Sequence, residues 1–250
     1  MKVLGIESAS LVASVAMVQD GQMTAEYTLN LKKTHSQTLL PMIDQMMQLL
    51  GEDISTVDAI AVSAGPGSFT GLRIGASTAK GIGFVTGKPL VSVPTMDAMA
   101  YGVYGTDAII CPMLDARRKQ VYTGLYRWTE EGFTVINPQW MSDAADLCAE
   151  LNRLGERAVL LGDGADAVRD VIERELRVPY TFAPVPANRQ RGASVAALGE
   201  QMALRGETVG AAEFRPDYLR KSQAERERDV AEKQGELDKL AAGIVVHEHD

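Results

Sequence analysis

Two carboxylates stand where apolar strands of this 250-residue chain end in turns. Glu7 follows a short apolar strand and precedes Ser8, and Asp115 follows a second apolar strand near the middle of the chain. Carboxylates in such positions can hold a metal ion that in turn binds phosphates. After Asp115, however, Arg117 and Arg118 stand where a close phosphate approach would need glycine. The second turn therefore has the composition of a degenerate phosphate site, in which Asp115 orients an arginine instead.

Glycine turns offer a related chemistry, because backbone N–H groups at a helix N-terminus bind anions. Gly65-Pro66-Gly67 precedes a helical segment, but no Gly-Lys-Ser/Thr follows it, so it is not a Walker loop. A tight structural turn is the favoured interpretation. Gly162 and Gly164 lie in a turn typical of an adenosine site, although they equally suit a strand-to-helix connection. The candidate vestigial nucleotide site consists of Glu7, Ser8, Gly65, Gly67, Asp115, Gly162 and Gly164.

Other catalytic chemistries have little support in the sequence. Of the three histidines, only His35 lies outside the last four residues, so no mid-chain two-histidine metal site can be assembled. No serine lies in a Gly-x-Ser-x-Gly elbow. The two cysteines form no Cys-x-x-Cys pair. We therefore expect no catalytic residue, no metal site and no tightly bound cofactor in this chain.

The overall charge and hydrophobicity limit the kinds of partner. The net charge is −8 and the basic residues are scattered, so unaided binding to a polyanion lacks its usual electrostatic drive. Any nucleic acid is expected to be held by another protein. No stretch of eighteen apolar residues occurs, and no positively charged leader precedes an apolar run. The expected location is the cytoplasm, with no membrane contact.

One predicted helix, within Ser63–Thr86, carries an unusual strip of small residues. Gly71, Gly75, Ala79 and Gly83 are spaced by four, so on a helix they form one strip with almost no side chains. Glycine inside a helix costs roughly 1 kcal/mol relative to alanine, so this spacing needs a compensating reason. Close approach of a second backbone is that reason, and the strip is predicted to be a docking surface.

A second predicted helix, within Thr34–Leu50, is apolar over more of its circumference than a surface helix needs. Thr34 and Gln37 fit a capping box, while Pro41 favours a start near Thr38 or a kink. The excess apolar surface indicates contact with the protein's own sheet and with a second body; burial within its own domain is the alternative. The predicted partner interface consists of Leu39, Leu40, Met42, Ile43, Met46, Met47, Leu50, Gly71, Leu72, Gly75, Ala76, Ala79 and Gly83.

The order of predicted elements in the first hundred residues is β-β-β-α-β-α-β-α, and the pattern then repeats. This duplication predicts an α/β protein with the actin-like (ASKHA, ribonuclease-H-like) fold, in which two lobes contain mixed sheets flanked by helices. The predicted parts are a first lobe at 1–104, a second lobe at 105–221, and a charged segment at 222–250. In that last segment Val230, Leu237 and Ile244 form a thin apolar seam, as a helix packed along the first lobe or as a frayed tail.

Several motifs resemble those of the TsaB (YeaZ) family of bacterial tRNA threonylcarbamoyladenosine biosynthesis. Most specific is the run from Gly65 to Gly75, GPGSFTGLRIG, followed by Ala79-Lys80-Gly81. Further matches are Thr34-His35-Ser36, Leu39-Leu40-Pro41, Asp115-Ala116-Arg117, Val121-Tyr122 and Pro216-Asp217-Tyr218-Leu219-Arg220. One departure is Glu7, where typical TsaB chains have aspartate and the paralogue TsaD has this glutamate. TsaD is longer, however, and carries a histidine pair for metal that this chain lacks.

The resemblance implies a non-catalytic scaffold that pairs with the catalytic subunit TsaD through first-lobe helices, with the ATPase TsaE bound to the pair. ATP and metal would be used by these partners, and tRNA would be reached only through the complex. A homodimer through the same face is expected when the partner is absent. An ATP-dependent kinase or ATPase with Glu7 and Asp115 near a metal is the alternative. Metallopeptidase activity is a third, less supported interpretation.

Overall fold

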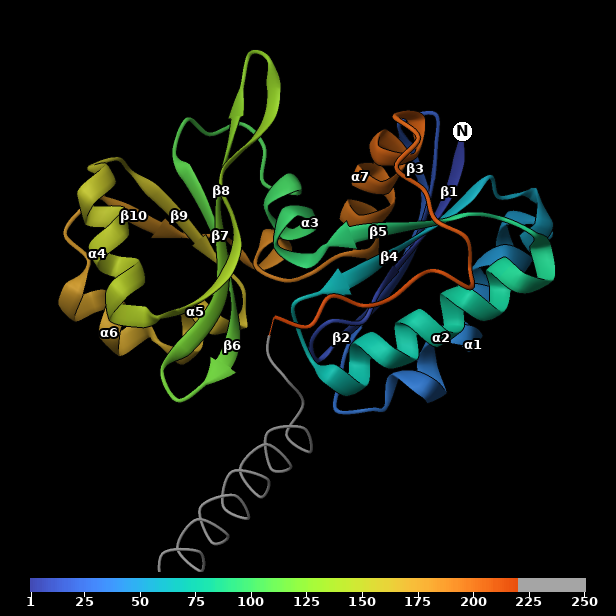
Figure 1. Ribbon diagram of the computed structural model, residues 1–250, viewed down its shortest axis with the longest axis horizontal. Helices are drawn as coiled ribbons and strands as arrows, with labels where there is room; N and C mark the ends of the chain where they lie inside the picture. Colours follow the sequence, from blue (N-terminus) through green and yellow to red (C-terminus); the bar gives the residue numbers. More distant parts are fainter. Residues whose placement is uncertain (220–250) are drawn as a thin grey trace, which may run out of the picture. The chain divides into compact units, whose positions relative to one another are not determined.

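A computed structural model describes residues 1–219, of which Met1–Asp217 form one compact unit containing two five-stranded mixed sheets (Figure 1). The first sheet has the strand order β3-β2-β1-β4-β5, with bounds Lys2–Glu7 (β1), Val12–Gln19 (β2), Gln22–Asn30 (β3), Ala59–Gly65 (β4) and Leu90–Pro94 (β5). The second has the order β10-β9-β6-β7-β8, with bounds Ile109–Arg117 (β6), Gln120–Thr129 (β7), Gly132–Asp143 (β8), Ala158–Leu161 (β9) and Tyr180–Phe182 (β10).

The two sheets share one topology, which confirms the predicted duplication. In each sheet the first three strands form an antiparallel meander, and the fourth and fifth strands are parallel to the first. Strands β1 and β4 are almost entirely buried, as expected for the apolar runs of strands that are covered on both faces. The fold is the predicted actin-like, two-lobe α/β class.

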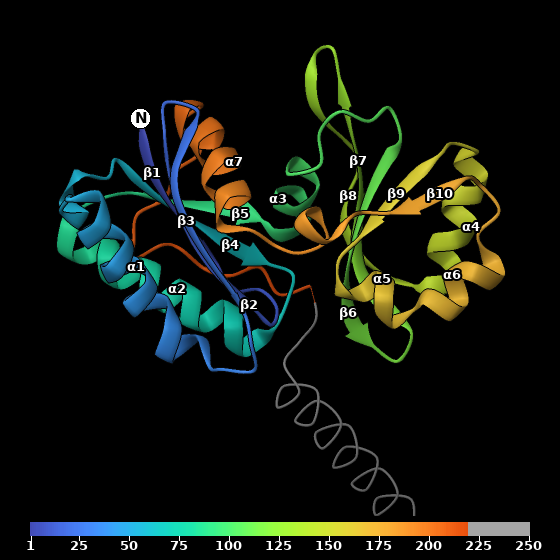
Figure 2. The same cartoon turned by 180° about the vertical axis from the view of Figure 1, so that it is seen from behind.

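Helices cover the outer face of each sheet. Beside the first sheet lie α1 (His35–Leu50) and α2 (Phe69–Thr86), which run next to each other in both views (Figures 1 and 2). Beside the second lie α4 (Ala144–Leu154), α5 (Asp163–Ala167) and α6 (Arg169–Glu175). Helices α5 and α6 are separate, because Val168 between them has a non-helical φ of −116°.

The remaining two helices are exchanged between the sheets. Helix α3 (Thr95–Tyr101) follows the first sheet and keeps contacts with β4 and β5, but it also packs on β6, β7 and β8 of the second sheet. Helix α7 (Gly192–Leu204) follows the second sheet but packs on β1, β2, β4 and β5 of the first. Glycine permits this contact, since a Cβ on Gly199 would lie 2.3 Å from Cβ of Ala61. Each sheet is therefore covered on its inner face by the other lobe's helix.

The segment after α7 also returns to the first sheet. Val209 pairs with Leu90 at the edge of β5, and Phe214 is buried in the core of the first lobe. Residues 192–217 thus pack on the first lobe, whereas the sequence placed them in a second lobe at 105–221. The apolar side chains of α7 join the core cluster on the inner face of the first sheet, while Ala211 and Phe214 join the cluster beneath α1 and α2, a pairing that sequence order does not encode. The expected charged segment 222–250 lies outside the described residues.

Two local expectations are also corrected. The predicted capping box at α1 is not formed, because Thr34 makes no side-chain capping hydrogen bond. The helix nevertheless begins at His35 and contains Pro41 within it. Within residues 1–219, no helix has the length and apolar character needed to cross a membrane.

Candidate partner-binding helices and glycine turns

The turn before α2 is held by contacts with the loop after β1. The N–H of Ser68 donates to the carbonyl oxygen of Ala9 at 2.6 Å, and a Cβ on Gly67 would lie 2.3 Å from that oxygen. Ser68 Oγ caps the helix by accepting the N–H of Gly71 at 3.3 Å. On the other side, the N–H of Gly65 donates to Thr95 Oγ1 at 3.1 Å. The N–H groups of Gly65, Ser68 and Gly71 are thus occupied by contacts within the chain, which supports the structural-turn interpretation.

The small-residue strip of α2 faces the protein's own interior. A Cβ on Gly71 would lie 2.1 Å from the carbonyl oxygen of Ser8, and one on Gly75 would lie 2.1 Å from Ser8 Oγ. Farther along, a Cβ on Gly83 would lie 2.6 Å from Leu90 Cδ1. The strip does allow close approach of a second segment, as its spacing predicts. That segment is the strand end of this same chain, so the strip is internal packing here.

The apolar face of α1 is likewise buried within the first lobe. The helix contacts β2, β3 and α2, so its two-sided contact is made inside the chain. Of the thirteen residues predicted for the partner interface, only Leu40 is exposed and Leu50 is half-buried. The other eleven are buried, namely Leu39, Met42, Ile43, Met46, Met47, Gly71, Leu72, Gly75, Ala76, Ala79 and Gly83.

A smaller set of apolar side chains remains accessible on these two helices. Leu40 and Leu49 of α1 are 54% and 73% exposed, and Phe84 and Val85 of α2 are 64% and 87% exposed. Leu49, Phe84 and Val85 all lie in the last turns of their helices. The prediction of an interface missed these three, although a Phe-Val pair next to Gly83 at the end of a helix was a readable signal. Large apolar side chains exposed on two neighbouring helices make these helices candidates for an interaction surface.

Glu7 is enclosed rather than presented to solvent. Its side chain is 1% exposed, and Oε1 accepts the N–H of Ala9 at 2.6 Å. Oε2 has no hydrogen-bond partner among the described residues. Burial raises the pKa of Glu7 to about 7, against the opposing hydrogen bonds from Ala9, Ser63 and Ser8. The carboxyl group is therefore a buried acid whose charge is costly.

This burial predicts a pH dependence of stability. The ordinary pKa of the side chain is 4.5 and the folded-state pKa is about 7, so between these values the folded protein binds more protons than the unfolded chain. The free energy of unfolding should fall by roughly 3 kcal/mol as the pH rises through this window. Glu7→Gln should remove that fall, as measured by urea unfolding at pH 5 and pH 8. The exposed Glu131→Gln is the control, and an unchanged pH dependence in Glu7→Gln would contradict the assignment.

The corresponding turn of the second lobe is also closed. A Cβ on Gly162 would lie 2.0 Å from the carbonyl oxygen of Met113, and one on Gly164 would lie 2.7 Å from the carbonyl carbon of Leu114. Asp115 accepts the N–H of Arg117 at 2.7 Å and pairs with its guanidinium at 3.1 Å. Asp115 thus orients an arginine, as its neighbours predicted. The glycines serve close packing of α5 against β6.

The hairpin between β6 and β7 has an unusual backbone. Arg117, Arg118 and Lys119 have φ values of 70°, 56° and 61°, and the last two form the two-residue loop. Such loops require positive φ, which Asn-Gly supplies at little cost. For residues with a Cβ the left-handed conformation costs roughly 1–2 kcal/mol each. Turn formation accounts for the positive φ of the two loop residues, but not for the presence of arginine and lysine where asparagine and glycine would cost less.

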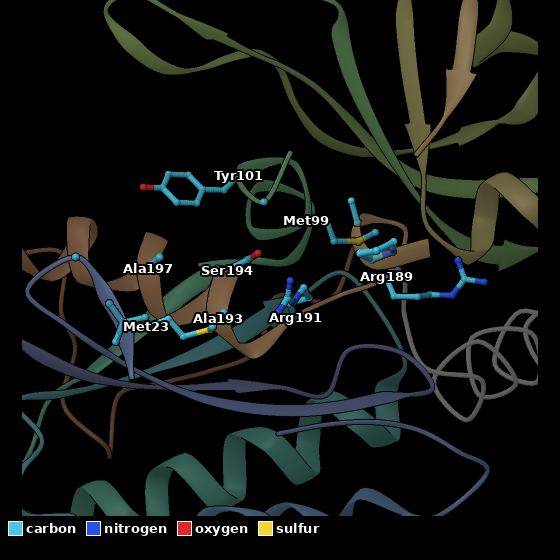
Figure 3. A pocket seen from close by; sticks show the side chains of 13 residues that line it. Met23, Met99, Tyr101, Arg189, Arg191, Ala193, Ser194 and Ala197 are labelled. Atoms are coloured by element: carbon cyan, nitrogen blue, oxygen red, sulfur yellow. The ribbon is translucent and has the colours of Figure 1, made fainter. Parts of the chain in front are cut away.

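A groove of about 400 Å³ lies where α3 and α7 approach each other (Figure 3). Met23, Tyr101 and Ser194 line it together with two arginines. Arg189 pairs with Asp166, and Arg191 pairs with Glu26, so both guanidinium charges are neutralised within the chain. None of the seven residues of the candidate nucleotide site lines this groove. Within residues 1–219, no three His, Cys, Asp or Glu side chains gather as metal ligands.

The fold and the glycine turns together define a class of protein. It is a duplicated actin-like fold in which contacts within the chain fill the turns that could otherwise bind phosphate. Comparison with known proteins narrows this class. The model of the family described as "TsaD: tRNA N6-adenosine threonylcarbamoyltransferase" matches residues 22–228. A Bacillus subtilis relative, "tRNA threonylcarbamoyladenosine biosynthesis protein TsaB", is 28% identical over 225 residues, covering 90% of this chain and 96% of the relative.

Two further comparisons agree. Escherichia coli TsaB is 28% identical over 236 residues, covering 90% of this chain and 96% of the relative. A crystal structure of "an uncharacterized protein with similarity to peptidase YEAZ from Pseudomonas aeruginosa" superposes with a TM-score of 0.75 at 24% identity, covering 88% of this chain and 99% of that one. The chain belongs to the TsaD family and, within it, to the TsaB (YeaZ) type.

Proposed function

We propose that this chain is the non-catalytic scaffold subunit of the machinery that makes tRNA threonylcarbamoyladenosine. In this role it pairs with TsaD, and TsaE binds the pair. The complex transfers a threonylcarbamoyl group from its adenylate to the adenosine next to the anticodon of tRNAs that read codons beginning with A. ATP and metal are used by the partner subunits.

The observation that carries this proposal is the accessible apolar set on α1 and α2. Leu40, Leu49, Phe84 and Val85 leave apolar surface uncovered on two adjacent helices, in a chain with a net charge of −8. Helix faces of this kind pack against a second pair of helices, burying apolar area that water otherwise contacts. The closed glycine turns add support, because their N–H groups and glycine positions serve internal contacts.

Reconstitution tests the proposal. Purified TsaD, TsaE and the enzyme that makes the threonylcarbamoyl adenylate are assayed for transfer to tRNA with and without this chain. Transfer is expected only with the chain present, and equal transfer without it contradicts the scaffold role. Calorimetry of the isolated chain with ATP and magnesium is the companion measurement. Tight binding with turnover would favour a kinase or ATPase instead.

A further inference from the structure

The tip of the β6–β7 hairpin presents cations whose backbone is strained. Two of the three are anchored, since Arg117 pairs with Asp115 and Lys119 Nζ lies 2.7 Å from both carboxylate oxygens of Asp170. These pairs are solvent-exposed and therefore weak. Arg118 lies between them, is exposed, and forms no ion pair with any residue in 1–219. Arg118 is thus the cation of this tip whose guanidinium forms no ion pair within residues 1–219.

The residue types at this tip make the loop backbone more strained than it needs to be. Glycine or asparagine would meet the positive φ with less strain, yet arginine and lysine occupy both loop positions. Strain of this kind is retained where a side chain has another role. A guanidinium offers a planar fork of donors that matches a phosphate group. The side chain of Arg118 is therefore suited to an anionic partner.

The shape of the site distinguishes among anions. Arg117, Arg118 and Lys119 project from an open hairpin, and none of them lines the groove between α3 and α7. An open tip cannot surround a free anion and exclude water from it. A phosphate group that is part of a larger molecule is already held in position, so it can contact an exposed arginine without being surrounded by protein. The net charge of −8 also means that the chain alone would hold a polyanion weakly.

We propose that Arg117–Lys119 form a contact point for the phosphate backbone of tRNA held by the assembled complex. The inference rests on the proposed function, because a partner subunit must place the RNA. In it, Arg118 meets a phosphate directly, while Arg117 and Lys119 position the tip and add positive potential. The contact is sequence-independent, since phosphates carry no base information.

Binding of an unmodified tRNA transcript to the preassembled complex with TsaD tests the contact. The transcript reads a codon beginning with A, and fluorescence anisotropy is recorded over a series of salt concentrations. Arg118→Gln removes the charge and Arg118→Gly removes both charge and strain. Each should weaken tRNA binding about tenfold at low salt and reduce the slope of log K against log salt by about 0.7–1. Arg118→Gly should also raise the Tm above that of Arg118→Gln.

Arg174→Gln is the matched control, because it removes the same charge from another exposed arginine of this lobe. It should bind tRNA like the wild type. Assembly with TsaD is measured separately by light scattering, and all variants should assemble. Wild-type tRNA affinity in both Arg118 variants, or loss of TsaE binding in place of tRNA binding, would overturn the inference and leave the scaffold role intact. Failure of the wild-type chain to pair with TsaD would overturn both.

Discussion

Replacing Gly75 by leucine is expected to lower the free energy of unfolding by about 3 kcal/mol or more, the upper range for overpacking a close contact. A Cβ at this position would lie 2.1 Å from Ser8 Oγ and 3.3 Å from Ser8 Cβ. Neither atom can move freely, because Ser8 is fully buried and its hydroxyl donates to the carbonyl oxygen of Gly71 at 3.0 Å. The strand end and α2 must therefore separate. Denaturant unfolding followed by circular dichroism measures the loss.

Gly81 provides the control within the same helix. A Cβ there meets no atom within 4 Å, so Gly81→Ala should raise the free energy of unfolding by up to about 1 kcal/mol through helix propensity. If Gly75→Leu lowers the free energy of unfolding and Gly81→Ala raises it, the effect of packing is distinguished from the effect of helix propensity. If Gly75→Leu unfolds at the wild-type denaturant concentration, the internal role of the strip is contradicted. A bulky residue at Gly75 cannot test partner pairing, because it disturbs the fold itself.

Pairing with TsaD is tested by charging the accessible ends of α1 and α2. The double variant Leu49→Glu, Phe84→Glu should raise the Kd for TsaD at least about 100-fold. Large apolar side chains at the centre of an interface commonly contribute 2 kcal/mol or more each, and a buried unpaired carboxylate adds a further cost. Both side chains are solvent-exposed in the isolated chain, so its stability should be nearly unchanged. Isothermal titration calorimetry gives the Kd.

Val185→Glu is the matched control for this experiment. Val185 is 89% exposed and lies in the 3-10 turn Val185–Ala187, outside both helices. It should leave the Kd for TsaD and the circular dichroism spectrum unchanged. Wild-type affinity of the double variant would contradict the proposed interface. The double variant Leu49→Glu, Phe84→Glu also tests self-association. A homodimer formed through this face should dissociate in that variant, as the pair with TsaD should.

The order and type of the elements were predictable because their signals are local. Alternating or continuous apolar runs identified all ten strands, and the repeated order gave the duplicated fold. The exchange of α3 and α7 was not predictable, because the apolar residues of α7 indicate burial but not the sheet that provides it. For the same reason, the lobe boundary expected at residue 104 does not separate the packing, since α3 contacts both sheets and α7 packs on the first.

For the site, the sequence predicted close packing of α2 but assigned it to a second protein, whereas eleven of the thirteen predicted interface residues are buried within this chain. The four-residue spacing of Gly71, Gly75 and Gly83 correctly predicted close approach of another segment. Whether that segment belongs to this chain or to a second protein depends on where the end of β1 lies in the fold. This position follows from tertiary packing and cannot be read from the local sequence. Phe84 and Val85 were not included in the predicted interface, and their exposure depends on where α2 packs rather than on their residue types.

The exchanged helices have a consequence for how the chain can be divided. A single lobe cut from this protein would keep its strands but lose the helix from the other lobe that covers their inner face, and its own last helix would lose the contacts that it makes with the other sheet. Two such halves restore every contact only by trading these helices, which is the arrangement of a domain-swapped dimer. The described part of the chain thus resembles a swapped dimer joined into one polypeptide, and its two lobes belong to one compact unit.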